Sequence, residues 1–338
     1  MSRKKMALAA LGTILALALG LVVWLLVAKD YAIAEEHVTI EGPRGELHAV
    51  LAKPVQDANP HGVVIFVQDR GPNDADTGTY RPIWDAYAKA GFAVLSWDKP
   101  GVDGAPGNWL NQTIHDRVSE VQSVISWAYK RPDLDTTRIG IWGEGQAGFV
   151  VPEVLAARSD IRFATLVGPS TNWIHDRLFA VRADLTARGD STTEVAAAVD
   201  RRDRFFTLLE SGSNYQTYVR SGIDSPPMLA PAFAFAERNF RADAANAVAR
   251  ISTPLLLVLG GEDRAVDIAQ TESLYRSKMR SDLLTVKTFA DATHIITRNQ
   301  IEYRDDFRVS ARTLFAPTSV YAPGYLDTLR IFAKHAIA

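Results

Sequence analysis

Patterns typical of buried strands alternate with helical patterns along most of this chain. Short apolar runs rich in β-branched residues occur at GVVIFV (62–67), FAVLSW (92–97), RIGIWG (138–143) and FATLVG (163–168). Stretches with apolar residues at helical spacing lie between these runs, as in IHDRVSEVQSVISWAYK (114–130). Fully apolar strands joined by helices are typical of parallel sheets. The alternation therefore predicts an α/β fold with short right-handed crossovers.

Further strand patterns occur before and after this region. HVTIEGPRGELHAVLAKP (37–54) predicts two strands around a Gly-Pro-Arg-Gly turn. PLLLVLGG (254–261) and LLTVKTFA (283–290) predict two more buried strands, and YLDTLRIFAKHAIA (325–338) predicts a last helix. The sheet is thus expected to draw its strands from both halves of the chain.

The segment 171–250 interrupts the alternation. It has helical patterns at 176–189 and 192–211 but no strand pattern. We therefore expect a helical lid or cap insertion over residues 171–250. This insertion would divide the core into a first part, 37–170, and a second part, 251–338.

The N-terminus has the pattern of a membrane anchor. Residues 1–5 contain three basic side chains, and residues 6–28 contain no charge. At about 1.5 Å per residue, this apolar stretch would be roughly 34 Å long as a helix, which is enough to cross a bilayer. The basic residues predict that 1–5 is a cytoplasmic tail, and that a linker, 29–36, leads to a periplasmic or extracellular domain. AIA (32–34) leaves a cleaved signal peptide as the alternative.

Composition excludes several other classes of protein. The formal net charge is -2, and no aromatic and basic residues are interleaved, so nucleic-acid binding is not expected. The chain has no cysteine, so the exported domain must be stable without disulfides. IHDR occurs twice, at 114–117 and 174–177, but adjacent His and Asp residues seldom bind one metal ion, and we interpret both as helix starts. Neither a metal nor a cofactor is predicted.

Three motifs indicate where a reaction site would lie. GIWGEGQAGFV (140–150) has the outline of a strand-to-helix turn rich in glycine, LVLGGEDRAVD (257–267) places Asp263 after a buried strand, and FADATHIITR (289–298) places His294 after the next one. With the order of strands, these motifs resemble the α/β-hydrolase superfamily, and in particular exported serine esterases and acyl hydrolases of the prolyl-oligopeptidase-like group. The resemblance extends from about residue 38 to the C-terminus.

The resemblance implies an eight-stranded, mostly parallel sheet flanked by helices, with a catalytic triad in the order Ser, Asp, His. It assigns the acid to Asp263 and the base to His294. It places the nucleophile position at Gly145, which has no side chain and is therefore vacant. It also implies that Arg70 and Gln146 occupy the oxyanion-hole positions.

The residues around the turn depart from the superfamily in other ways. Relatives carry His-Gly-x-Gly-Pro after the third strand, whereas this chain has QDRGP (68–72). Asp69 would oppose a developing oxyanion unless it turns away or pairs with Arg70, and Glu144 would add a second carboxylate. In DKPG (98–101), proline replaces the arginine of the usual Asp-x-Arg-Gly.

These features favour a pseudoenzyme, meaning a non-hydrolytic binding or scaffold protein of the cell envelope. Its partner would be a lipid or acyl ligand, or an envelope protein. One alternative is an ester or acyl hydrolase with another nucleophile, such as Ser96 or Ser170, or with water activated by Glu144 or Glu262. A further alternative is an inactivated form of a serine esterase.

Overall fold

The computed structural model describes residues 30–55, 60–75, 79–303 and 315–337, together with Gly20, Trp24 and Arg312. Apart from Gly20 and Trp24, the predicted membrane span 6–28 lies outside the described residues, as does the tail 1–5. Within the described part of the chain, every helix is too short or too polar to cross a membrane.

The described residues form one eight-stranded sheet in the order β1-β2-β4-β3-β5-β6-β7-β8. Strands β1, β2 and β4 pair antiparallel, and the remaining pairs are parallel. The strands are β1 (Ile33–Gly42), β2 (Gly45–Pro54), β3 (His61–Val67), β4 (Phe92–Trp97), β5 (Leu134–Glu144), β6 (Ile161–Val167), β7 (Leu255–Gly260) and β8 (Leu284–Phe289). This topology is the predicted α/β-hydrolase fold, and it places β5 between β3 and β6 near the middle of the sheet.

Strand β3 explains why the central strands are apolar on both faces. All of its residues are buried. Val63 and Ile65 face one hydrophobic cluster, and Val64 and Phe66 face the other, because successive side chains of a strand point to opposite faces. Helices cover both sides, so neither face of the strand can be polar.

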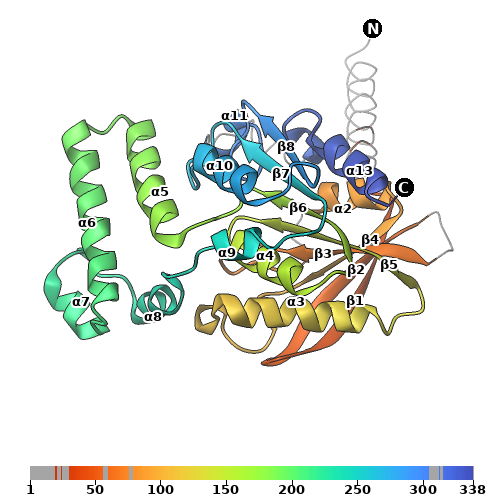
Figure 1. Ribbon diagram of the computed structural model, residues 1–338, viewed down its shortest axis with the longest axis horizontal. Coiled ribbons are helices and arrows are strands. Elements are labelled where there is room, and N and C mark those ends of the chain that lie inside the picture. The colour runs from red at the N-terminus through yellow and green to blue at the C-terminus, as the bar shows by residue number, and fades with distance from the viewer. Residues whose placement is uncertain are drawn as a thin grey trace, which may run out of the picture.

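Two helical layers enclose the sheet (Figure 1). On one face α2 packs against α13, and on the other α3 packs against α4, which contacts α9. The helices of the core are α2 (Arg81–Ala88), α3 (Ile114–Ala128), α4 (Ala147–Ala157), α10 (Ile268–Lys278), α11 (Asn299–Glu302) and α13 (Tyr325–His335), with short 3₁₀ turns η1 (Trp109–Asn111) and η2 (Pro317–Val320).

Five helices lie between β6 and β7. They are α5 (Trp173–Arg188), α6 (Thr192–Glu210), α7 (Tyr215–Ser221), α8 (Ala230–Asn239) and α9 (Ala245–Val248). Figure 1 shows α5 to α8 extending beyond one end of the sheet, with α5 and α6 side by side. These helices lie in the segment 171–250, for which the sequence predicts a helical lid or cap insertion.

The predicted linker 29–36 is too long at its C-terminal end. Strand β1 already begins at Ile33, and its first residues pair with the last residues of β2. The sequence pattern is weak here because β1 is an edge strand with several exposed polar side chains, which produce no continuous apolar run.

Candidate active site

Gly145 lies at the sharp turn between β5 and α4. Its φ is +53°, a left-handed conformation that glycine adopts without strain. The Gly145 N–H donates to the carbonyl of Val167 on β6, and its carbonyl accepts from Gly148 and Ser170. A Cβ on Gly148 would lie 2.3 Å from the Ser170 carbonyl oxygen, so this position has no room for a side chain. The glycines therefore preserve the shape of a nucleophile elbow.

The carboxylate of Asp69 fills the vacant nucleophile position. An ideal Cβ on Gly145 would lie 2.2 Å from Oδ1 of Asp69 and 2.3 Å from its Cγ. The same Oδ1 accepts a hydrogen bond of 2.6 Å from the backbone N–H of Gln146. Asp69 therefore points into the site. Its carboxylate accepts the backbone N–H of Gln146, the residue that the resemblance places in the oxyanion hole.

Asp263 and His294, which the resemblance assigns as acid and base, form a hydrogen-bonded pair. Nδ1 of His294 lies 2.8 Å from Oδ2 of Asp263. Oδ1 of Asp263 accepts from the N–H groups of Ala265 and Val266, so the carboxylate caps the turn as well as orienting the imidazole. A Cβ on Gly260 would meet the carbonyl oxygen of Thr293 at 2.0 Å, so glycine allows the two loops to touch directly.

The surroundings of His294 favour the protonated imidazolium. Burial alone would lower the pKa of His294. The charge of Asp263 and its hydrogen bond, followed by the charges of Asp69 and Glu144, outweigh burial and raise the pKa to about 9. With this pKa the ring is mainly protonated at neutral pH, with a proton on each nitrogen.

Glu144, the residue before the vacant position, is also buried. Burial raises its pKa to about 7, although the hydrogen bond from the Tyr80 hydroxyl, 2.6 Å from Oε1, opposes that increase. The charge of Asp69 contributes to the same rise. Two carboxylates thus lie at the elbow, and the pKa of one of them, Glu144, is raised.

Buried charges behind the elbow hold the Asp69 loop in place. Nζ of Lys99 donates to the Asp69 carbonyl at 2.9 Å, and Nη1 of Arg117 donates to the Gln146 side chain at 2.7 Å. Burial lowers the pKa of both Lys99 and Arg117, and it raises that of Glu120.

No motif in the sequence indicates that these three residues belong to the site. A signal was present for two of them. Arg117 and Glu120 lie at helical spacing with Val121 and Val124, on the apolar face of α3. A charged side chain on such a face requires a partner inside the protein.

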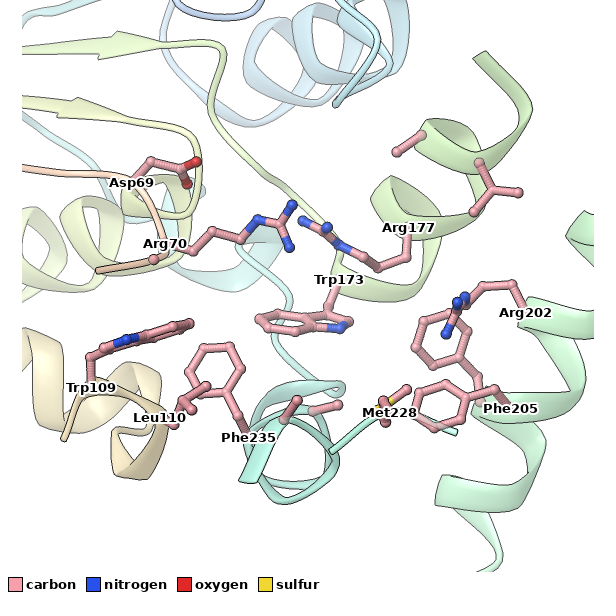
Figure 2. A pocket seen from close by; sticks show the side chains of 16 residues that line it. Asp69, Arg70, Trp109, Leu110, Trp173, Arg177, Arg202, Phe205, Met228 and Phe235 are labelled. Carbon is pink, nitrogen blue, oxygen red and sulfur yellow. The ribbon is translucent and has the colours of Figure 1, made fainter. Parts of the chain in front are cut away.

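A cavity of about 670 Å³ opens beside Asp69 (Figure 2). It lies between the Asp69 loop, η1 and three helices of the insertion, α5, α6 and α8. Its walls are mainly apolar and aromatic. Arg70, predicted at an oxyanion position, extends its guanidinium group into this cavity toward Arg177. Arg202 of α6 also lines the cavity.

The other candidate residues do not reach the nucleophile position. The hydroxyl of Ser96 is buried against Gln68, and the hydroxyl of Ser170 bonds to the Asp176 carboxylate. Glu262 is exposed. Among the described residues, no group of three or more His, Cys, Asp or Glu side chains is arranged to hold a metal ion.

A family model for serine aminopeptidases (S33) matches residues 58–300. The chain belongs to this family of α/β-hydrolases. It is also 22% identical over 219 residues to an uncharacterized 31.7 kDa protein of the traX-finO intergenic region of Escherichia coli, which covers 62% of this chain and 76% of that protein.

Solved esterase structures share this α/β-hydrolase fold. Est1E from Butyrivibrio proteoclasticus, solved with ferulic acid, is 14% identical, with a TM-score of 0.57 over 89% of this chain and 97% of that one. The esterase Pf2001 of Pyrococcus furiosus is 16% identical, with a TM-score of 0.52 over 85% of this chain and 93% of that one. An acylaminoacyl peptidase of Pyrococcus horikoshii is 15% identical, with a TM-score of 0.52 over 85% of this chain and 41% of that one.

Proposed function

We propose that this α/β-hydrolase is a pseudoenzyme that binds a ligand in its cleft without hydrolysing it. The observation that carries the proposal is the Asp69 carboxylate in the space of the missing side chain at Gly145. A serine hydrolase requires an alkoxide at this position, together with free amide donors for the oxyanion. Here a carboxylate replaces the hydroxyl and already accepts the Gln146 amide.

The protonation of His294 supports the same proposal. A general base acts best when its pKa is near the working pH. With a pKa of about 9, the imidazolium of His294 stabilises Asp69 and Asp263 instead of accepting a proton. In this proposal the former catalytic pair has become a structural ion cluster.

We further propose that the protein works in the cell envelope, with its folded domain in the periplasm or outside the cell. The support is the uncharged segment 6–28 preceded by basic residues. A lipid or acyl ligand, or a protein of the envelope, would then be within reach of the cleft. A carbonate-resistant membrane fraction, together with protease access to the domain in spheroplasts, would support this location. Release by carbonate, or protection of the domain, would contradict it.

One observation favours a second function. Glu144 is a buried carboxylate at the elbow with a pKa of about 7, as suits a general base. It would take a proton from water, and the resulting hydroxide would attack an ester carbonyl directly. The occupied Gln146 amide is unfavourable for that reaction, because an oxyanion formed there would have to displace Asp69.

The test treats the purified full-length protein with a serine-reactive phosphonate and with a panel of short-chain esters. We expect neither labelling nor turnover. Labelling, or turnover that His294→Gln abolishes, would overturn the pseudoenzyme proposal. Turnover that persists without labelling and is lost in Glu144→Gln would establish the activated-water alternative.

A further inference from the structure

We propose that Arg70 and Arg177 bind the carboxylate of an amphiphilic ligand whose apolar part lies in the adjoining cavity. The inference rests on the proposed binding function of the cleft, and it specifies the ligand as an organic acid. The inference also rests on the side chains of Arg70 and Arg177, which line the cavity beside the elbow and not the elbow itself.

The two arginines approach each other from different elements. Arg70 belongs to the loop after β3, whereas Arg177 belongs to the first turns of α5, and their guanidinium groups point toward one another (Figure 2). Nε of Arg177 is buried and, among the described residues, has no hydrogen-bond partner. Burial, followed by the charge of Arg70, lowers the pKa of Arg177 to about 10. Two like charges held together in this way favour an anion between them.

The nearby carboxylates offset the charge of this pair only in part, because Asp69 and Asp176 raise the pKa of Arg177 but burial and the charge of Arg70 outweigh them. Asp69 lines the same cavity, but its Oδ1 is engaged by the Gln146 amide and its charge faces the His294 imidazolium. Asp176 lies in the same turn of α5 as Arg177 and directly precedes it in the chain. It is buried, and its Oδ2 accepts from the backbone of Thr171. Burial raises the pKa of Asp176 to about 7, so it is only partly ionised at neutral pH.

The rest of the cavity suits an apolar or aromatic group. The rings of Trp109, Trp173 and Phe235 lie along one side of the arginine pair (Figure 2). Phe235 makes an edge contact with Trp109 at a centroid distance of 5.3 Å and also packs against Trp173 at 5.7 Å. Arg177 itself lies 5.7 Å from the Trp173 ring centre. A cavity with aromatic walls and two arginines at one end fits a molecule that has an apolar body and one anionic group.

The planar guanidinium group favours a carboxylate as the anionic end. Each arginine can offer two parallel N–H donors, which match the two oxygens of a carboxylate. A third arginine, Arg202, lines the far part of the cavity, but it is already near Asp224 at 3.8 Å and lies over the Phe205 ring. The anionic end is therefore assigned to Arg70 and Arg177.

The experiment measures binding of phenylbutyrate to the purified full-length protein by isothermal titration calorimetry. Phenylbutanol, phenylbutylamine and phenylbutyl phosphate serve as neutral, cationic and phosphate-bearing counterparts. We expect phenylbutyrate to bind about tenfold or more tightly than phenylbutanol, which corresponds to about 1.4 kcal/mol or more. Arg70→Gln and Arg177→Gln should each remove that preference without changing the affinity for phenylbutanol.

Arg204→Gln is the matched control. Arg204 lies on α6, its side chain is 61% exposed, and it pairs with Asp200 rather than lining this cavity. Its substitution should leave every affinity unchanged. Arg70 is exposed, so Arg70→Gln should fold normally even if Arg177→Gln does not.

Equal affinities for phenylbutyrate and phenylbutanol would overturn the proposal, as would retention of the preference in both arginine variants. Stronger binding of phenylbutyl phosphate than of phenylbutyrate would overturn the assignment to a carboxylate. Hydrolysis is measured separately with phenylbutyrate methyl ester. Turnover of that ester would contradict the pseudoenzyme proposal while leaving the anion site intact, so the two failures can be distinguished.

Discussion

Asp69 and Gly145 share the space of one side chain. The distance of 2.2 Å between Oδ1 of Asp69 and an ideal Cβ on Gly145 is far shorter than any contact between real atoms of these types. The two departures from a serine hydrolase, one in the loop after β3 and one at the elbow, are therefore physically coupled. Their substitutions should not behave independently.

The first prediction concerns restoration of the serine. Gly145→Ser should destabilise the protein by about 1–3 kcal/mol, because the new side chain overlaps Asp69. Asp69→Gly/Gly145→Ser should recover most of that loss and should be labelled by a phosphonate, whereas Gly145→Ser alone should not. Urea unfolding of the wild type, both single variants and the double variant gives the coupling energy. Additive effects would contradict the shared space.

The second prediction concerns the proton on His294. Its pKa should be about 9 in the folded protein, well above the ordinary value of 6.5. NMR titration of the imidazole resonances, assigned with His294→Gln, measures this value. Asp69→Asn should lower the pKa, because it removes one of the negative charges that hold the proton. A wild-type value below neutrality would contradict the ion cluster.

The third prediction concerns stability at alkaline pH. The pKa of His294 is raised on folding, so its contribution is complete below about pH 6.5 and is lost as the pH rises through about 9. The shift corresponds to about 3 kcal/mol at most. Denaturant unfolding from pH 6 to 10 should therefore show decreasing stability, and His294→Gln should flatten the profile over this interval. An unchanged slope in the variant would assign the effect to other groups.

The fourth prediction concerns Glu144. Its raised pKa means that ionisation opposes folding as the pH rises from about 4.5 through about 7. Glu144→Gln retains an acceptor for the Tyr80 hydroxyl and removes the buried charge. We expect the variant to be more stable than wild type at pH 8, by about 1–3 kcal/mol, and close to wild type at pH 4.5. Thermal unfolding at the two pH values tests this difference.

The strands were predictable because burial on both faces leaves a strong pattern. The apolar run of β3, for example, indicates a strand that is covered by helices on both faces. The assignment of Asp263 and His294 came from the resemblance to the α/β-hydrolase superfamily, and the strand pattern contributed only their location in the loops after two buried strands.

The direction of Asp69 could not be read from the sequence. The motif left open whether its carboxylate turns away, and the answer depends on the loop backbone and on Lys99 and Arg117 behind it. The arginine pair of the cavity was equally hidden. Arg70 and Arg177 are distant in the chain, and only the packing of α5 against the core brings them together.

The overlap at the elbow also restricts how such a chain can evolve. A serine at position 145 together with an aspartate in the observed orientation at position 69 is the least favourable of the four combinations. A path of single substitutions from a hydrolase to the present chain would therefore lose the serine first and acquire the carboxylate afterwards. As long as Asp69 keeps this orientation, a serine that arises at position 145 is opposed by the overlap, so a chain of this kind gains the hydroxyl only if position 69 changes as well.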